Sequence, residues 1–179
     1  MAKIKVGEIF PDFVYDTPFE TGKHLKDEVK GVTALMFLRY YGCSLCRFDL
    51  HDYKVNYDKI TAAGGKLIAV IQSEAAYMKE EIPAGEYPYD IVCDPDCLLY
   101  DKFDIPVMAE GAKFEMTEKA AKIFGKIKEL GYEHGKYEGR ETQLPAAFIL
   151  DGDMKVIYAH YAKDMTDLPD AAEIVELMK

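Results

Sequence analysis

The sequence lacks several features that would each have pointed to a different class of protein. Its 179 residues contain 22 basic and 32 acidic side chains, and the formal net charge of −10 argues against nonspecific binding to nucleic acid or to an anionic membrane surface. The longest apolar runs, such as 34–38 and 146–150, are far too short to span a membrane. The first residues lack the hydrophobic region of a signal peptide, so we expect a cytoplasmic protein.

Cysteine is also scarce, with four residues in the chain. In a cytoplasmic protein, so few cysteines are expected to be reactive, metal-bound or free, and not to form a framework of structural disulfides. No repeat, low-complexity segment or domain boundary interrupts the chain, and its length is near that of one domain. We therefore expect a single domain over residues 1–179; the sequence specifies no oligomeric state.

Apolar runs separated by turn residues predict an α/β fold. The expected strands are 32–39, 66–72, 87–92, 144–151 and 154–161, and the expected helices are 43–63, 73–82, 97–103, 116–130 and 164–178. The β-α alternation over the first three strands predicts a mostly parallel sheet, whereas the turn at Asp151 and Gly152 predicts an antiparallel final pair. Residues 1–26 are expected to form a hairpin extension, and 106–143 a helical insertion whose end, 131–143, is an exposed and mobile loop.

Two cysteines stand where the first strand turns into the first long helix, in the order Gly42, Cys43, Ser44, Leu45, Cys46, Arg47. The apolar positions of that helix lie on one face: Cys46, Leu50, Tyr53, Tyr57 and Ile60. Cys46 therefore heads the buried face, and we expect Cys43, at the start of the helix, to be the accessible thiol.

This arrangement is typical of thiol–disulfide chemistry. A nucleophilic thiol must be ionised near neutral pH, and a helix N-terminus, a nearby cation or the Cys-x-x-Cys spacing can each lower its pKa. Arg39 and Arg47 flank the pair and are the candidate cations. Cys43 is then the predicted nucleophile, and Cys46, one turn later, resolves the mixed disulfide that forms on it.

Two other interpretations of the cysteines stay open. The pair could be one half of a zinc site completed by Cys93 and Cys97, in which case the fold would serve as a non-enzymatic binding module. The pair could also be redox-inert, because free cysteine is often buried in cores. Asp94 is better explained as a residue that caps a helix than as a catalytic carboxylate.

Several segments together resemble the alkyl hydroperoxide reductase/thiol-specific antioxidant (AhpC/TSA) family, and more narrowly its peroxiredoxin-like branch with Gly-Cys-x-x-Cys-Arg. The segments are Gly7 with 11–13, the strand leading into 42–47, the Cys-Asp-Pro-Asp stretch at 93–96, and Pro-Ala-Ala-Phe-Ile-Leu-Asp-Gly-Asp at 145–153. The resemblance covers most of the chain except about 106–143. It implies a thioredoxin-like fold with a central mixed sheet flanked by helices, an antioxidant oxidoreductase activity without a cofactor, a disulfide or hydroperoxide substrate, and a thiol reductant that the sequence does not identify.

The resemblance also divides the function into two hypotheses. Aligned with peroxiredoxins, Cys46 takes the peroxidatic position, while Cys43 and Arg39 replace the threonine and proline of the family motif. Pro145 stands where peroxiredoxins place an arginine, and it instead looks like the cis-proline beside the thiols of thioredoxins. The leading hypothesis is thiol–disulfide exchange by Cys43 and Cys46, with Tyr41, Leu144 and Pro145 forming the substrate groove. The alternative is a thiol peroxidase in which Cys46 attacks the peroxide and Cys43 resolves.

Overall fold

The computed structural model describes residues 3–179, so the first two residues of the expected extension 1–26 lie outside it. Its elements, in chain order, are β1 (Val14–Tyr15), β2 (Lys23–His24), α1 (Leu25–Glu28), β3 (Val32–Phe37), α2 (Ser44–Val55), α3 (Tyr57–Ala62), β4 (Gly65–Ile71), α4 (Ala75–Glu81), β5 (Asp90–Cys93), α5 (Leu98–Lys102), α6 (Glu118–Glu129), β6 (Ala146–Leu150), β7 (Val156–Tyr161) and α7 (Ala171–Leu177). The predicted α/β class is confirmed.

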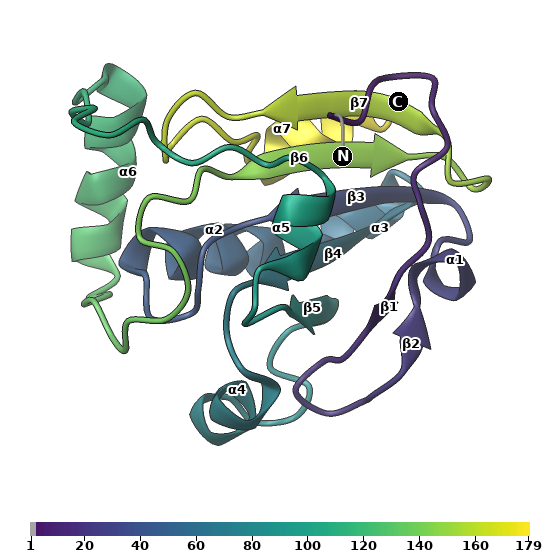
Figure 1. The fold of residues 1–179 in the computed structure, drawn as a ribbon, viewed down its shortest axis with the longest axis horizontal. Coiled ribbons are helices and arrows are strands. Elements are labelled where there is room, and N and C mark those ends of the chain that lie inside the picture. The colour runs from purple at the N-terminus through teal and green to yellow at the C-terminus, as the bar shows by residue number, and fades with distance from the viewer. Residues whose placement is uncertain (1–2) are drawn as a thin grey trace.

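A five-stranded mixed sheet forms the centre of the molecule, with the strand order β5-β4-β3-β6-β7 (Figure 1). Strands β3, β4 and β5 run parallel, as the alternation of strands and helices predicted. Strand β6 is antiparallel to β3, and β7 is antiparallel to β6 as expected from the Asp151 turn. The strand that leads to the thiols, β3, therefore lies in the middle of the sheet, where both of its edges are paired.

Both faces of the sheet are buried, which is why the strands read as continuous apolar runs. Successive side chains of β3 enter opposite cores: Met36 packs with α2 and α3 residues, whereas Leu35 and Phe37 pack with Phe10 and Phe103. The first core includes the buried face predicted for 43–63, and both cysteines of the pair belong to it. The thiols thus sit at the edge of a packed apolar layer.

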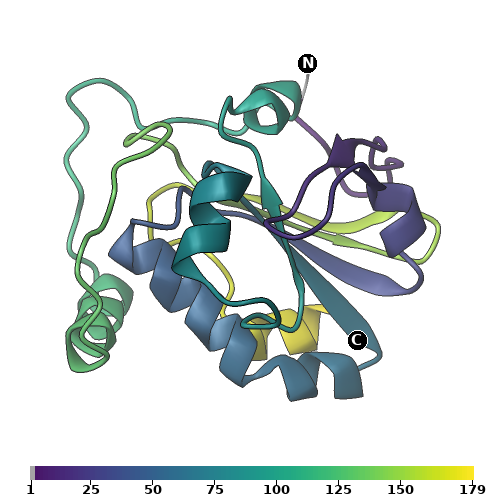
Figure 2. The ribbon, with the colours of Figure 1, turned by 90° about the horizontal axis from the view of Figure 1, so that it is seen from below.

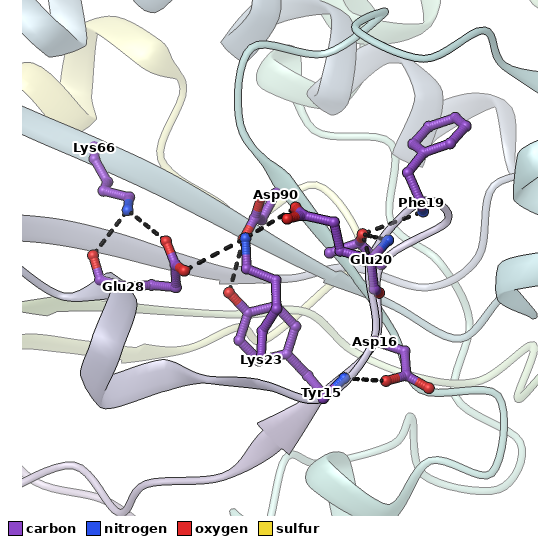
Figure 3. Close-up of polar contacts among 10 residues, drawn as sticks. Tyr15, Asp16, Phe19, Glu20, Lys23, Glu28, Lys66 and Asp90 are labelled. Carbon is purple, nitrogen blue, oxygen red and sulfur yellow. Dashed lines mark hydrogen bonds and ion pairs between the residues drawn. The ribbon is translucent and has the colours of Figure 1, made fainter.

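The N-terminal hairpin is confirmed: β1 and β2 are antiparallel neighbours. Figure 3 shows how charged side chains hold it against the central sheet. The ammonium group of Lys23 lies 2.9 Å from a carboxylate oxygen of Asp90 on β5, and the Tyr15 hydroxyl donates to the same carboxylate at 2.7 Å. Glu28 connects Lys23 to Lys66 on β4, so a polar network closes this end of the second core.

Three predicted helix boundaries are wrong for local reasons. The helix expected over 43–63 is divided into α2 and α3 at Asn56, whose side-chain amide donates to the carbonyl of Asp52 and competes with the helical pattern. The last helix begins after Asp170 and not at 164, because the Asp170 side chain and Glu173 form a reciprocal capping box. Glu74, not Ser73, precedes α4, and Ser73 has a different partner described below.

The insertion places α6 at the end of the sheet where α2 begins, as Figures 1 and 2 both show. Residues 131–143, which we call the cover segment, lead from α6 back to β6. Their side chains are mostly exposed and they form no helix or strand, as predicted. Over residues 3–179, no helix is both long enough and apolar enough to cross a membrane.

Candidate active site

The two thiols of the Cys-x-x-Cys pair lie where β3 ends and α2 begins. Cys43 is the N-cap residue of α2, and its sulfur accepts the backbone N–H of Cys46 at 3.4 Å. A cap residue accepts a helix N–H that would otherwise lack a partner, and it lies at the positive end of the helix dipole. The turn that brings Cys43 there is closed by its own N–H, which donates to the carbonyl of Tyr40 at 3.2 Å.

Arg39 joins both thiols to the rest of the site. One nitrogen of its guanidinium group donates to the Cys43 sulfur at 3.0 Å, and its backbone N–H donates to the Cys46 sulfur at 3.3 Å. Its side chain is only 13% exposed. Burial lowers the pKa of this guanidinium, but its neighbours, with Cys43 first among them, raise it more, so Arg39 stays charged at any physiological pH.

The environment separates the pKa values of the two thiols. A hydrogen bond from the Cys46 thiol and the charge of Arg39 outweigh burial and lower the pKa of Cys43 to about 5. Burial and the adjacent Cys43 thiolate raise the pKa of Cys46 well above its usual range. One ionised and one protonated thiol, one helical turn apart, are the pair that nucleophilic attack followed by resolution requires.

The prediction that Cys43 is the accessible thiol is wrong, because its exposed fraction is 1% and that of Cys46 is 4%. The cover segment crosses the turn that leads into α2, where it contacts Gly42 and Arg39, the neighbours of Cys43. The backbone N–H of Gly135 donates to the carbonyl of Gly42 at 2.7 Å. A side chain on Gly42 would overlap the backbone of Lys136, so glycine is what allows the two chains to approach.

Hydrogen bonds between side chains also hold the cover segment in place, at Tyr40 and at Ser73. The buried Tyr40 hydroxyl bonds to Glu141 and lies 3.0 Å from a ring nitrogen of His134. The Ser73 hydroxyl donates to the Glu138 carboxylate at 2.7 Å, which is why Ser73 does not cap α4. His134 is otherwise exposed, and no pattern in the sequence indicated its contact with Tyr40.

Of the other predicted site residues, Arg47 contacts the cover segment and Pro145 lies near Cys46. Arg47 bonds to the carbonyl of Glu133 and lies over the Tyr132 ring, so its charge is directed at the cover segment and not at a thiol. Tyr41 is half-buried with its ring 5.8 Å from Arg47. Pro145 borders a cavity of about 10 Å³ beside Cys46, too small for a substrate. Leu144 is buried and does not line that cavity.

The resemblance of Pro145 to a cis-proline is not reproduced, since every peptide bond in residues 3–179 is trans. The four-cysteine zinc site has no support either. Cys97 belongs to the core on the opposite side of the sheet from Cys43 and Cys46. Across the described residues, no three or more histidine, cysteine or acidic side chains gather as metal ligands would. Asp94 accepts the backbone N–H groups of Leu98 and Leu99, as the capping interpretation predicted.

Asp49 is the acidic neighbour of the thiols that the sequence pattern did not single out. It lies one turn after Cys46 on α2 and borders the same small cavity. On its other side it borders an open groove of about 460 Å³ between α2, α6 and α7. Burial, together with the Cys43 thiolate, raises the pKa of this carboxyl well above its usual range. Its spacing of three from Cys46 is the signal that could have placed it here.

Comparisons with known proteins identify the family and agree with the fold. The model of the AhpC/TSA family matches residues 6–159. The fold is similar to that of the peroxidoxin BcpB from Mycobacterium tuberculosis, with a TM-score of 0.70, 12% identity and coverage of 98% of this chain and 96% of that one. It is also similar to the peroxiredoxin 6 of Arenicola marina, with a TM-score of 0.70, 18% identity and coverage of 98% and 72%.

A third similar structure is that of a protein from Chlorobium tepidum assigned as the thiol:disulfide interchange protein DsbE. It has a TM-score of 0.61 and 17% identity, and the match covers 99% of this chain and 100% of that one. No curated protein matches the sequence. At these identities the structural matches establish the thioredoxin-like fold alone.

Proposed function

Because the chain belongs to the AhpC/TSA family of thiol-dependent oxidoreductases, we propose that it exchanges disulfides through Cys43 as the nucleophile and Cys46 as the resolving thiol. The observation that carries the proposal is the position of Arg39. Its guanidinium group donates to the Cys43 sulfur at 3.0 Å, whereas it is the backbone N–H of Arg39 that donates to the Cys46 sulfur. A cation placed on one thiol selects that thiol for ionisation.

The reaction follows from the two protonation states. The Cys43 thiolate attacks one sulfur of a substrate disulfide, the substrate S–S bond breaks, and the other sulfur leaves as a thiolate that takes up a proton. Cys46 then loses its proton and attacks the Cys43 sulfur. This step forms the Cys43–Cys46 disulfide and releases the second substrate thiol. The substrate gains two electrons from the enzyme and two protons, one released by Cys46 and one from solvent. A thiol reductant then returns the two electrons, and Cys46 regains its proton.

The experiment compares single variants in the reduction of a peptide disulfide. We expect Cys43→Ser to abolish turnover and Cys46→Ser to accumulate a mixed disulfide on Cys43, identified by mass spectrometry. Cys93→Ser is the matched control, because Cys93 lies outside the site and burial raises its pKa to about 12. Turnover by Cys43→Ser equal to that of the wild type would refute the assignment.

Hydroperoxide reduction is the second candidate, and the family match is the observation that favours it. It would require Cys46 to attack the peroxide as a thiolate, while Cys43 resolves the sulfenic acid that forms. The burial that keeps Cys46 protonated opposes this order of events. Peroxide consumption with a thiol donor, together with trapping of a sulfenic acid on Cys46 in a Cys43→Ser variant, distinguishes the two functions.

A further inference from the structure

Besides its side-chain contacts, the cover segment uses three main-chain groups to contact the residues next to Cys43. The carbonyl of Glu141 accepts from the Arg39 guanidinium at 2.5 Å, and the carbonyl of Glu133 accepts from Arg47. Between them, the N–H of Gly135 donates to the carbonyl of Gly42 at 2.7 Å. Each of these three contacts uses a group that every peptide unit carries. The groups around Cys43 are therefore arranged to bind a polypeptide backbone, and the chain's own backbone occupies them.

We propose that residues 131–143 act as a built-in competitor of the substrate, and that they must be displaced from Arg39, Arg47 and Gly42 before a disulfide reaches Cys43. The substrate class that this arrangement favours is a disulfide in an extended polypeptide, because such a chain offers the same carbonyl and N–H groups as the segment it replaces. The proposal rests on the assignment of Cys43 as the reacting thiol.

The contacts that hold the cover segment are of a kind that a substrate could displace, and they do not close the site permanently. Most of its anchors are hydrogen bonds, although the Tyr132 ring packs against the first core. The glycines at 131, 135 and 139 interrupt the segment, and two of them, Gly131 and Gly139, have positive φ angles. One well-buried anchor is Glu138, whose side chain is 7% exposed and accepts from the Ser73 hydroxyl and the Glu74 N–H. The carboxylate of Glu138 contacts Ser73, Glu74 and Lys136, so it can be changed without altering a residue of the thiol site.

The first measurement is the rate at which iodoacetamide alkylates Cys43 in the reduced protein, with the modified residue identified by mass spectrometry. Glu138→Ala should raise this rate by about tenfold, because it leaves the closed cover without two hydrogen bonds to a charged group. Glu133→Ala is the matched control: it removes the same kind of charge from the same segment, and within residues 3–179 the Glu133 side chain has no hydrogen bond or ion pair. Equal rates in the two variants would overturn the proposal.

The second measurement tests whether a backbone is what the site binds. A synthetic peptide of residues 131–143, added to the Glu138→Ala variant, should slow the alkylation of Cys43. The same peptide methylated on the nitrogen of Gly135 cannot donate to Gly42 and should protect much less. No protection, or equal protection by both peptides, would overturn the proposal. Neither measurement needs disulfide exchange, so a failure of the proposed function would appear separately, as absent turnover in every variant.

Discussion

Replacing Arg39 with methionine is the most direct test of what activates Cys43. The substitution keeps a long, apolar side chain and removes the guanidinium group 3.0 Å from the Cys43 sulfur. A hydrogen bond to a charged group contributes about 1.5–3 kcal/mol, and one pKa unit corresponds to about 1.4 kcal/mol. We therefore expect the pKa of Cys43 to rise by about one to two pH units, from about 5 to roughly 6–7.

The change is limited to that size because Arg39 is not alone in lowering the pKa. The largest single cause, the hydrogen bond from the Cys46 thiol, remains in the variant. Near neutral pH the thiolate fraction should fall from about 99% to a value between roughly one half and 90%. A complete loss of the thiolate is not expected from this substitution alone.

The measurement is the ultraviolet absorbance of the thiolate against pH, repeated as the pH dependence of iodoacetamide alkylation. Cys93 and Cys97 do not interfere near pH 5, because burial raises the pKa of both. Arg47→Met is the control, since the Arg47 guanidinium bonds to a cover carbonyl and its removal should leave the pKa of Cys43 within about 0.3 pH units. An Arg39→Met pKa equal to or below that of the wild type, or a larger change in the control, would refute the reasoning.

Three further predictions concern stability and redox balance. The folded-state pKa of Cys43 lies below the value near 8.5 of an unfolded chain, so its thiolate stabilises the reduced fold above that value and this stabilisation is lost as the pH falls towards about 5. Urea unfolding of reduced wild type and Cys43→Ser should therefore show a difference in stability that grows in favour of the wild type from pH 5 to pH 8; a difference that is constant with pH would contradict this. The same stabilisation of the reduced form predicts a reduction potential above the roughly −270 mV of thioredoxin, measured by equilibration with glutathione, and a lower value would contradict it. Asp170→Ala should lower the free energy of unfolding by about 1 kcal/mol through loss of the α7 capping box, with exposed Asp153→Ala as the control for denaturation midpoints.

Local patterns were enough to predict most of the fold. The strands of the central sheet follow from continuous apolar runs, and the buried face of α2 follows from the spacing of Cys46, Leu50 and Tyr53. The hairpins were marked by turn residues such as those around Asp151. The errors at Asn56 and Asp170 arose where a single polar side chain, and not the apolar period, decides where a helix ends or begins.

The site could be predicted only as far as its chemistry is local. Arg39, Cys43 and Cys46 are close in sequence, and the structure brings them together. The cover beside Cys43 is held instead through Gly135 and Glu141, which are about a hundred residues away and lie in a segment without a period. Exposure is a property of what packs against a residue, so the pattern of α2 alone could not reveal it. The glycine directly before Cys43 was the one local sign that another backbone approaches there.

The charge of the whole molecule and the charge beside Cys43 act in opposite directions, and distance decides between them. A net charge of −10 disfavours the formation of one more negative charge. If the thiol responded only to this overall charge, its pKa would be raised. Exposed charges farther away than about 8 Å are largely screened at physiological salt, whereas the buried Arg39 guanidinium at 3.0 Å is not. The low pKa of Cys43 therefore depends on the local groups that face it, and raising the salt concentration should leave that pKa almost unchanged while it weakens the exposed ion pairs elsewhere on the surface.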